Sequence, residues 1–146
     1  MPDGRVCSHP DKPLEAHLLN TWRVAGEIRE CFDLSLSQTE KIGILLHDIA
    51  KAHPAFQKRL ESGQGKFGHA EPSAVLVLSQ TKDLLCAEAV RRHHAGLENV
   101  GEFKKFWGEC DFEDKERSII KRLKWWPGAK QVIQELGTNI NIKSWA

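Results

Sequence analysis

Apolar residues recur at helical spacing along most of this 146-residue chain. One such run, with Leu14, Leu18 and Ile28 on its apolar face, predicts an amphipathic helix over about 13–32. A second helix is expected to begin at Ser37, because Ser37 and Glu40 form the sequence pattern of a capping box. Strand patterns are weak by comparison. The sequence therefore predicts an all-α fold.

Proline and glycine divide the rest of the chain into shorter segments. Pro54 either ends the second helix or opens a short helix that extends to about residue 60. Three glycines between residues 62 and 68 predict a loop. Further helices are expected at about 72–79, 83–94, 113–126 and 128–136. We therefore expect a bundle of six or seven helices in a single domain that spans residues 1–146.

The balance of charges limits what the surface as a whole can bind. The chain has 21 basic and 20 acidic side chains, which give a net charge of +1. This argues against a strongly basic nucleic-acid-binding protein, but not against an enzyme that acts on nucleic acid at a local site. No apolar run is long enough to span a membrane, and no signal peptide is recognisable, so we expect a cytoplasmic protein.

The chain has seven histidines, and the most informative of them precedes an aspartate in the pair His47-Asp48. Histidine is the commonest metal ligand, and a carboxylate can bridge two cations. We expect both residues on the second helix, where Lys51 would face the same way and could meet a phosphate held by the metals. Taken alone, the pair is more typical of a helix surface than of a metal site.

Four other histidines lie where they could join this pair, although each has an ordinary structural interpretation. His17 would lie beside the apolar face of the first helix, where a histidine is usually a core residue. His69 follows the glycine-rich loop. His93 and His94 come in tandem at the end of a helix, where the helix dipole favours one histidine but does not explain two.

The order of these residues, H…HD..K…H…HH, resembles that of the HD-domain metal-dependent phosphohydrolases. The longer motifs around these residues are similar to those of one branch, the HD nuclease domain of the CRISPR type I helicase-nuclease (the Cas-three family). The similar segments read PLEAHL at residues 13–18, LHDIAKAHPAFQ at 46–57, GHAE at 68–71 and RHHAGL at 92–97. They cover about two-thirds of the chain, and the PAFQ and HHAGL segments are the most specific. The resemblance implies an HD-domain helical bundle.

The resemblance also implies two divalent transition metals at one site. His17, His47 and Asp48 would hold the first metal. The second would be held by four residues, with Asp48 as the bridge: Asp48, His69, His93 and His94. Manganese, iron, nickel and cobalt are the implied metals, with magnesium as a further candidate, and imidazole with carboxylate suits such ions better than calcium.

The implied activity is cleavage of single-stranded DNA phosphodiesters by a metal-activated water during CRISPR type I interference. Asp48 and Lys51 would be the catalytic residues, with Lys51 neutralising charge on the scissile phosphate. The implied partners are single-stranded DNA, a helicase domain or subunit and the RNA-guided CRISPR surveillance complex, and no membrane. The chain has no Walker A sequence, so ATP-driven unwinding would lie elsewhere.

The chain departs from the family pattern in one respect. The family supplies a further aspartate from a late helix, and no segment after Leu97 matches that motif. Asp111 and Asp114 are available, but their sequence setting differs from that of a ligand within a helix. We therefore expect that the chain lacks the last ligand-bearing helix, or that the first metal keeps extra water.

Three features lie outside the ligand pattern. His9 is expected in a loop before the first helix, close to the site but not in it. His53 is expected at the surface or beside the site, since the family pattern does not require histidine there. The basic and aromatic segment 121–126 could touch a nucleic-acid backbone, but we favour an amphipathic helix with buried tryptophans.

Two other functions remain open from the sequence. One is a different HD enzyme, a nucleotide phosphohydrolase or cyclic-nucleotide phosphodiesterase, with the same metals and a different pocket. The other is a degenerate HD domain that binds a partner without cutting. Assays on DNA and nucleotides separate the first from the nuclease, and metal content separates the second.

Overall fold

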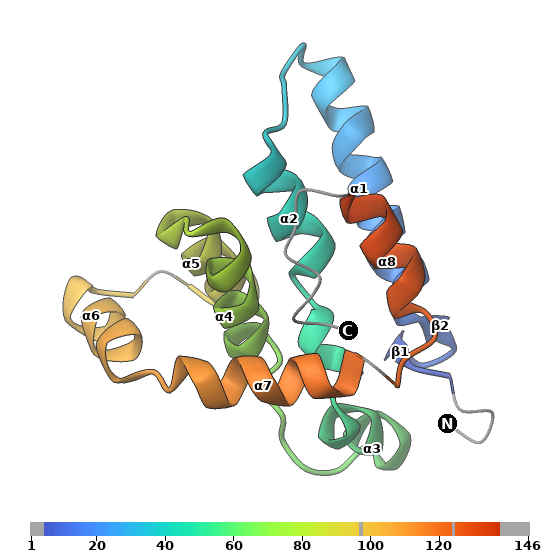
Figure 1. The fold of residues 1–146 in the computed structure, drawn as a ribbon, viewed down its shortest axis with the longest axis vertical. Helices are drawn as coiled ribbons and strands as arrows, with labels where there is room; N and C mark the ends of the chain where they lie inside the picture. The colour runs from blue at the N-terminus through green and yellow to red at the C-terminus, as the bar shows by residue number, and fades with distance from the viewer. Residues whose placement is uncertain (1–4, 97, 124, 138–146) are drawn as a thin grey trace.

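The structure is a computed structural model that describes residues 5–96, 98–123 and 125–137. Helices make up most of it, with one small sheet of two strands, so the prediction of an all-α fold is confirmed (Figure 1). The elements are β1 (Cys7–His9), β2 (Lys12–Pro13), α1 (Leu14–Cys31), α2 (Gln38–Leu46), the 3-10 helix η1 (Ile49–Ala52), α3 (Pro54–Ser62), α4 (Ala70–Thr81), α5 (Leu84–Arg92), α6 (Val100–Glu109), α7 (Phe112–Leu123) and α8 (Ala129–Leu136).

The core lies around α2 and α4. Helix α2 packs against α1, α4, α5 and α8, and α4 packs also against α7. Fully buried side chains from several helices meet there, among them Leu18, Leu45, Leu76 and Val132. A Cβ atom at Gly43 would lie 2.6 Å from Cys86 Sγ, so glycine at this position allows the close approach of α2 and α5.

A short antiparallel hairpin, β1 and β2, precedes α1. The backbone turns at Asp11 with a φ of 62°, and Leu14 N donates to Val6 O across 2.9 Å. The sequence did not predict this hairpin because its strands are too short for an alternating pattern to emerge. The hairpin places His9 beside the first turns of α1.

The second predicted helix is broken in the structure. Helix α2 begins at the predicted capping box, in which Ser37 Oγ accepts from Glu40 N and Glu40 Oε2 accepts from Ser37 N. It ends at Leu46, and His47 and Asp48 form a turn before η1. The expectation that His47 and Asp48 lie within one continuous helix was wrong.

Contacts from other helices explain the break. Ala50 N donates to Ser73 Oγ of α4 across 3.0 Å, and Gln57 Nε2 of α3 donates to Lys51 O across 2.7 Å. These bonds hold η1 in its tighter form. They come from residues distant in sequence, so local helix propensity could not indicate them.

The structure has eight α-helices in the described residues, against six or seven expected. The unexpected one is α6, where Asn99 Oδ1 caps the helix by accepting from Glu102 N. Asn99 as a helix cap could have predicted α6 from the sequence. None of the described helices has the length and apolar character needed to cross a bilayer.

Candidate metal centre

Five imidazoles from distant parts of the chain meet around the carboxylate of Asp48. His17 comes from α1, His47 and Asp48 from the turn after α2, and His69 from the residue before α4. His93 and His94 follow the end of α5. The structure therefore brings together all six residues that the sequence suggested as ligands.

The two oxygens of Asp48 face two different sets of nitrogen atoms. Asp48 itself is only 2% exposed. Oδ2 lies 3.0 Å from His17 Nε2, 3.5 Å from His47 Nε2 and 2.9 Å from Lys51 Nζ. Oδ1 lies 3.0 Å from His69 Nε2, 3.2 Å from His93 Nε2 and 3.9 Å from His94 Nε2. Such a carboxylate can bridge two cations.

The ligand atoms fall into two groups that share Asp48. One group is His17, His47 and Asp48, and the other is Asp48, His69, His93 and His94. Within each group the ligand atoms lie within 4.8 Å of one another, which is close enough to hold a metal ion. The division is the one that the family resemblance implied.

Helix ends orient two of the imidazoles. His47 Nδ1 donates to Ile44 O across 2.7 Å, and His93 Nδ1 donates to Val90 O across 2.5 Å. Each carbonyl lies in the last turn of a helix, where carbonyl groups accept from side chains or from the capping residue, as Val90 O also does from His93 N. A hydrogen bond of this kind fixes the ring and aims Nε2 at the site, as in many metal-binding histidines.

The surroundings of His69 Nε2 indicate most clearly that the site suits a bound metal ion. This nitrogen is buried and has no hydrogen-bond partner. Asp48 Oδ1 lies 3.0 Å away, but the two groups are not oriented for a hydrogen bond. A buried polar atom without a partner is rare and costly. A metal ion between the two residues would satisfy both, so the donor set fits a divalent metal.

The protonation states also suit metal binding. Burial by itself would raise the pKa of Asp48, but the imidazoles of His17, His69 and His93 beside its two oxygens outweigh it and lower the pKa well below its ordinary value. Burial lowers the pKa of His47 and keeps that ring neutral. The hydrogen bond to Asp48 raises the pKa of His93, so protons compete more strongly with a metal for this ring than for a free imidazole.

Lys51 places a buried positive charge against the same carboxylate. Its side chain is almost fully buried, and Nζ lies 2.9 Å from Asp48 Oδ2 and 5.6 Å from the centroid of the Phe56 ring. A buried ammonium needs such a partner. Lys51 therefore stabilises the ionised form of Asp48 in this structure.

Gln57 connects the N-terminal hairpin to the segment that carries Lys51. Its amide accepts from Cys7 N at 2.9 Å and donates to Cys7 O and to Lys51 O at 2.7 Å each. The side chain is 7% exposed. No role for Gln57 was expected from the sequence, although it is the last residue of the PAFQ segment.

Replacement of Gln57 by alanine should lower the free energy of unfolding by about 3 kcal/mol, because three buried backbone groups lose their partner. It should also weaken Mn²⁺ binding about tenfold, as the loss of a supporting contact does in other metal sites. Urea unfolding and calorimetric titration measure the two effects. Gln64→Ala, an exposed change in a loop, is the control, and equal stability of the two variants would contradict the prediction.

A second polar network holds the turn that follows His94. Arg91 pairs with Glu88 and with Glu98, and its guanidinium lies 4.3 Å from the centroid of the Phe106 ring of α6. Arg92 Nη1 also reaches Glu98 Oε1 at 2.9 Å. The helix that the sequence analysis missed therefore helps to fix the tandem histidines.

The two remaining histidines have different surroundings. The His9 ring meets the His17 ring edge to face, with centroids 5.3 Å apart, so His9 lies next to the site. His53 Nδ1 accepts from Ala55 N and caps α3, and its ring stacks on Phe67 at 4.8 Å. His53 is thus a capping residue.

The late aspartates do not reach the cluster. Asp111 Oδ1 accepts from Asp114 N and so caps α7, and neither residue belongs to the two ligand groups found in the described part of the chain.

In the basic and aromatic segment, residues 121–126, Leu123 and Trp126 are buried and Trp125 is exposed. Arg122 Nε donates to Ala52 O, which attaches this segment to η1.

In this all-α fold, five imidazoles meet at one carboxylate. This is the donor set of a metal-dependent hydrolase. A comparison with protein-family models agrees, since the model of the HD domain matches residues 14–129. The chain belongs to the HD domain family, within the HD metal-dependent phosphohydrolase superfamily. Searches of curated proteins and of solved structures gave no match.

Proposed function

We propose that this chain is a metal-dependent nuclease that cleaves phosphodiesters of single-stranded DNA in CRISPR type I interference. The observation that carries the proposal is the division of the Asp48 oxygens between two histidine groups. The PAFQ and HHAGL segments support the choice of a nuclease within the superfamily, because their sequences are similar to those of the Cas-three HD nucleases.

In this proposal, one metal would be held by His17, His47 and Asp48. A second would be held by four residues: Asp48, His69, His93 and His94. The ions would be manganese, iron, nickel or cobalt, with magnesium as a further candidate. Bound ions of this kind supply Lewis acidity, which makes water a nucleophile near neutral pH and stabilises charge on the phosphate.

The chain's own residues prepare this chemistry. Asp48 is kept ionised by Lys51 and the surrounding imidazoles, so it is ready to bridge. The carbonyls of Ile44 and Val90 hold two rings in position before any ligand arrives. Lys51 adds a fixed positive charge at the place where the scissile phosphate would lie, and we assign it a catalytic role beside Asp48.

The proposed partners follow from the same assignment. Single-stranded DNA would cross the surface by phosphate contacts and base stacking. A helicase domain or subunit would supply unwinding, and the RNA-guided surveillance complex would supply the target, in the cytoplasm.

The decisive experiment incubates the purified chain and Mn²⁺ with single-stranded DNA, and separately with a panel of nucleotides and cyclic nucleotides. We expect cleavage of the DNA that stops when the metal is chelated. Release of phosphate from nucleotides without DNA cleavage would replace the proposal with a nucleotide phosphohydrolase. Elemental analysis showing fewer than one bound metal per chain after reconstitution would indicate a domain that only binds a partner.

A further inference from the structure

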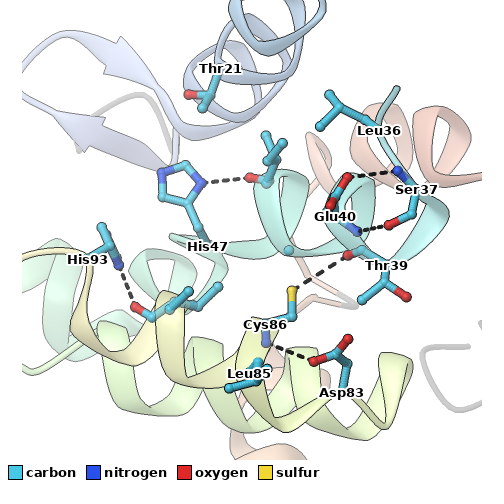
Figure 2. Close-up of a pocket in the computed structure, with 14 residues that line it drawn as sticks. Thr21, Leu36, Ser37, Thr39, Glu40, His47, Asp83, Leu85, Cys86 and His93 are labelled. Carbon is cyan, nitrogen blue, oxygen red and sulfur yellow. Dashed lines mark hydrogen bonds between the residues drawn. The ribbon is translucent and has the colours of Figure 1, made fainter. Parts of the chain in front are cut away.

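A cavity of about 510 Å³ opens beside the metal centre, between α1, α2 and α5. Figure 2 shows His47 and His93 at one end of it and the capping residues Ser37 and Glu40 at the other. Its volume lies in the range of about 300–1,000 Å³ that is usual for small-ligand sites. Because two candidate ligands line it, a substrate held at the metals has a direct path into the cavity.

The walls of the cavity are mainly apolar. Ile44 comes from α2, Leu85 and Val90 come from α5, and Leu36 comes from the segment before α2. Gly43 and Cys86 lie at the close approach of the two helices and also line the cavity. Apolar walls between closely packed helices suit a flat ring better than a phosphate.

The end of the cavity distant from the metals carries two carboxylates. Glu40 Oε2 accepts from Ser37 N, and Asp83 Oδ1 accepts from Cys86 N, so each is fixed by its helix cap. A carboxylate has more acceptor sites than one cap uses. These groups repel a second phosphate, but they accept hydrogen bonds from an amino group.

We propose that this cavity binds the nucleobase next to the phosphate held at the metal centre, and that it favours bases with an exocyclic amino group. The inference rests on the proposed function, since the metals fix the phosphate. Adenine, cytosine and guanine carry such an amino group, and a carboxylate can accept a hydrogen bond from it, as Glu and Asp do from cytosine N4. Thymine has no amino group, and its one ring donor, N3–H, lies between two carbonyl oxygens that repel a carboxylate.

The test titrates the Mn²⁺-loaded chain with dAMP, dCMP and dTMP in a calorimeter. We expect dAMP and dCMP to bind about fivefold or more tightly than dTMP. In Ala89→Phe the new ring enters the cavity from an exposed position on α5, so the fold should tolerate it. Each nucleotide should then bind at least about tenfold more weakly.

The same variant should keep wild-type affinity for Mn²⁺ and for inorganic phosphate, because the metal centre is unchanged. Ala55→Phe, at an exposed position on α3, is the matched control and should bind all nucleotides normally. Wild-type nucleotide affinity in Ala89→Phe would overturn the proposal, and so would equal binding of dTMP and dAMP by the wild type.

A double variant, Glu40→Gln with Asp83→Asn, tests the selectivity separately. Both amides can still cap their helices, but the charges are gone and each side chain can also donate. Discrimination against dTMP should disappear. If the wild type binds nucleotides as expected but does not cut DNA, the cavity inference stands and the nuclease proposal fails, whereas DNA cleavage without nucleotide selectivity gives the opposite result.

Discussion

Replacement of Asp48 by asparagine is expected to lower DNA cleavage by at least about 10³-fold, because a bridging carboxylate supports several kcal/mol of metal-derived stabilisation of the transition state. Asparagine keeps the shape of the side chain but cannot bridge two cations as an anion. Bound Mn²⁺ should fall to a small fraction of the wild-type content. Cleavage rates and elemental analysis measure the two effects.

The control for this change is Asp33→Asn, since Asp33 is exposed after the end of α1 and distant from the cluster in sequence and structure. Because Asp48→Asn leaves the buried ammonium of Lys51 without its counter-charge, circular dichroism should confirm that the variant is folded. The double variant Asp48→Asn with Lys51→Met removes that penalty and should be equally inactive. Substantial cleavage by either folded variant would refute the proposed site.

Metal binding should also stabilise the fold strongly. The ligands come from α1, from the turn after α2, from the residue before α4 and from the end of α5, so unfolding separates all of them. At a Mn²⁺ concentration 100 times the dissociation constant, the free energy of unfolding should rise by about 2.7 kcal/mol. This corresponds to an increase of about 10 °C in the melting temperature.

Thermal unfolding after treatment with a chelator, and again after Mn²⁺ is restored, measures this effect. Asp48→Asn should show almost no response to Mn²⁺, which separates binding at the cluster from binding elsewhere. A wild-type melting temperature that does not change with Mn²⁺ would contradict the prediction.

The residues that meet at the candidate site could be chosen from the sequence because their order is distinctive. No single histidine was sufficient: His17 by itself resembles a core residue, and His69 resembles an ordinary loop residue. The tandem His93-His94 and the pair His47-Asp48 made the order recognisable. The structure then brought all of these residues together around Asp48.

The geometry around the ligands could not be predicted in the same way. The helical pattern of the sequence continues through Asp48, but hydrogen bonds with Ser73 and Gln57 on other helices impose a tighter turn. The ring protons of His47 and His93 are accepted by backbone carbonyls, and a backbone contact of this kind cannot be recognised from residue types. The N-terminal hairpin is too short to produce a pattern of its own.

The bonds from His47 and His93 to the final turns of α2 and α5 tie coordination to the ends of two helices. If either final turn frays, its carbonyl moves and the ring is no longer aimed at the site. By reciprocity, an ion that holds the ring also holds the turn. Substitutions that change only how firmly these helices end should therefore tune the affinity for the ion, without any change to the ligands themselves.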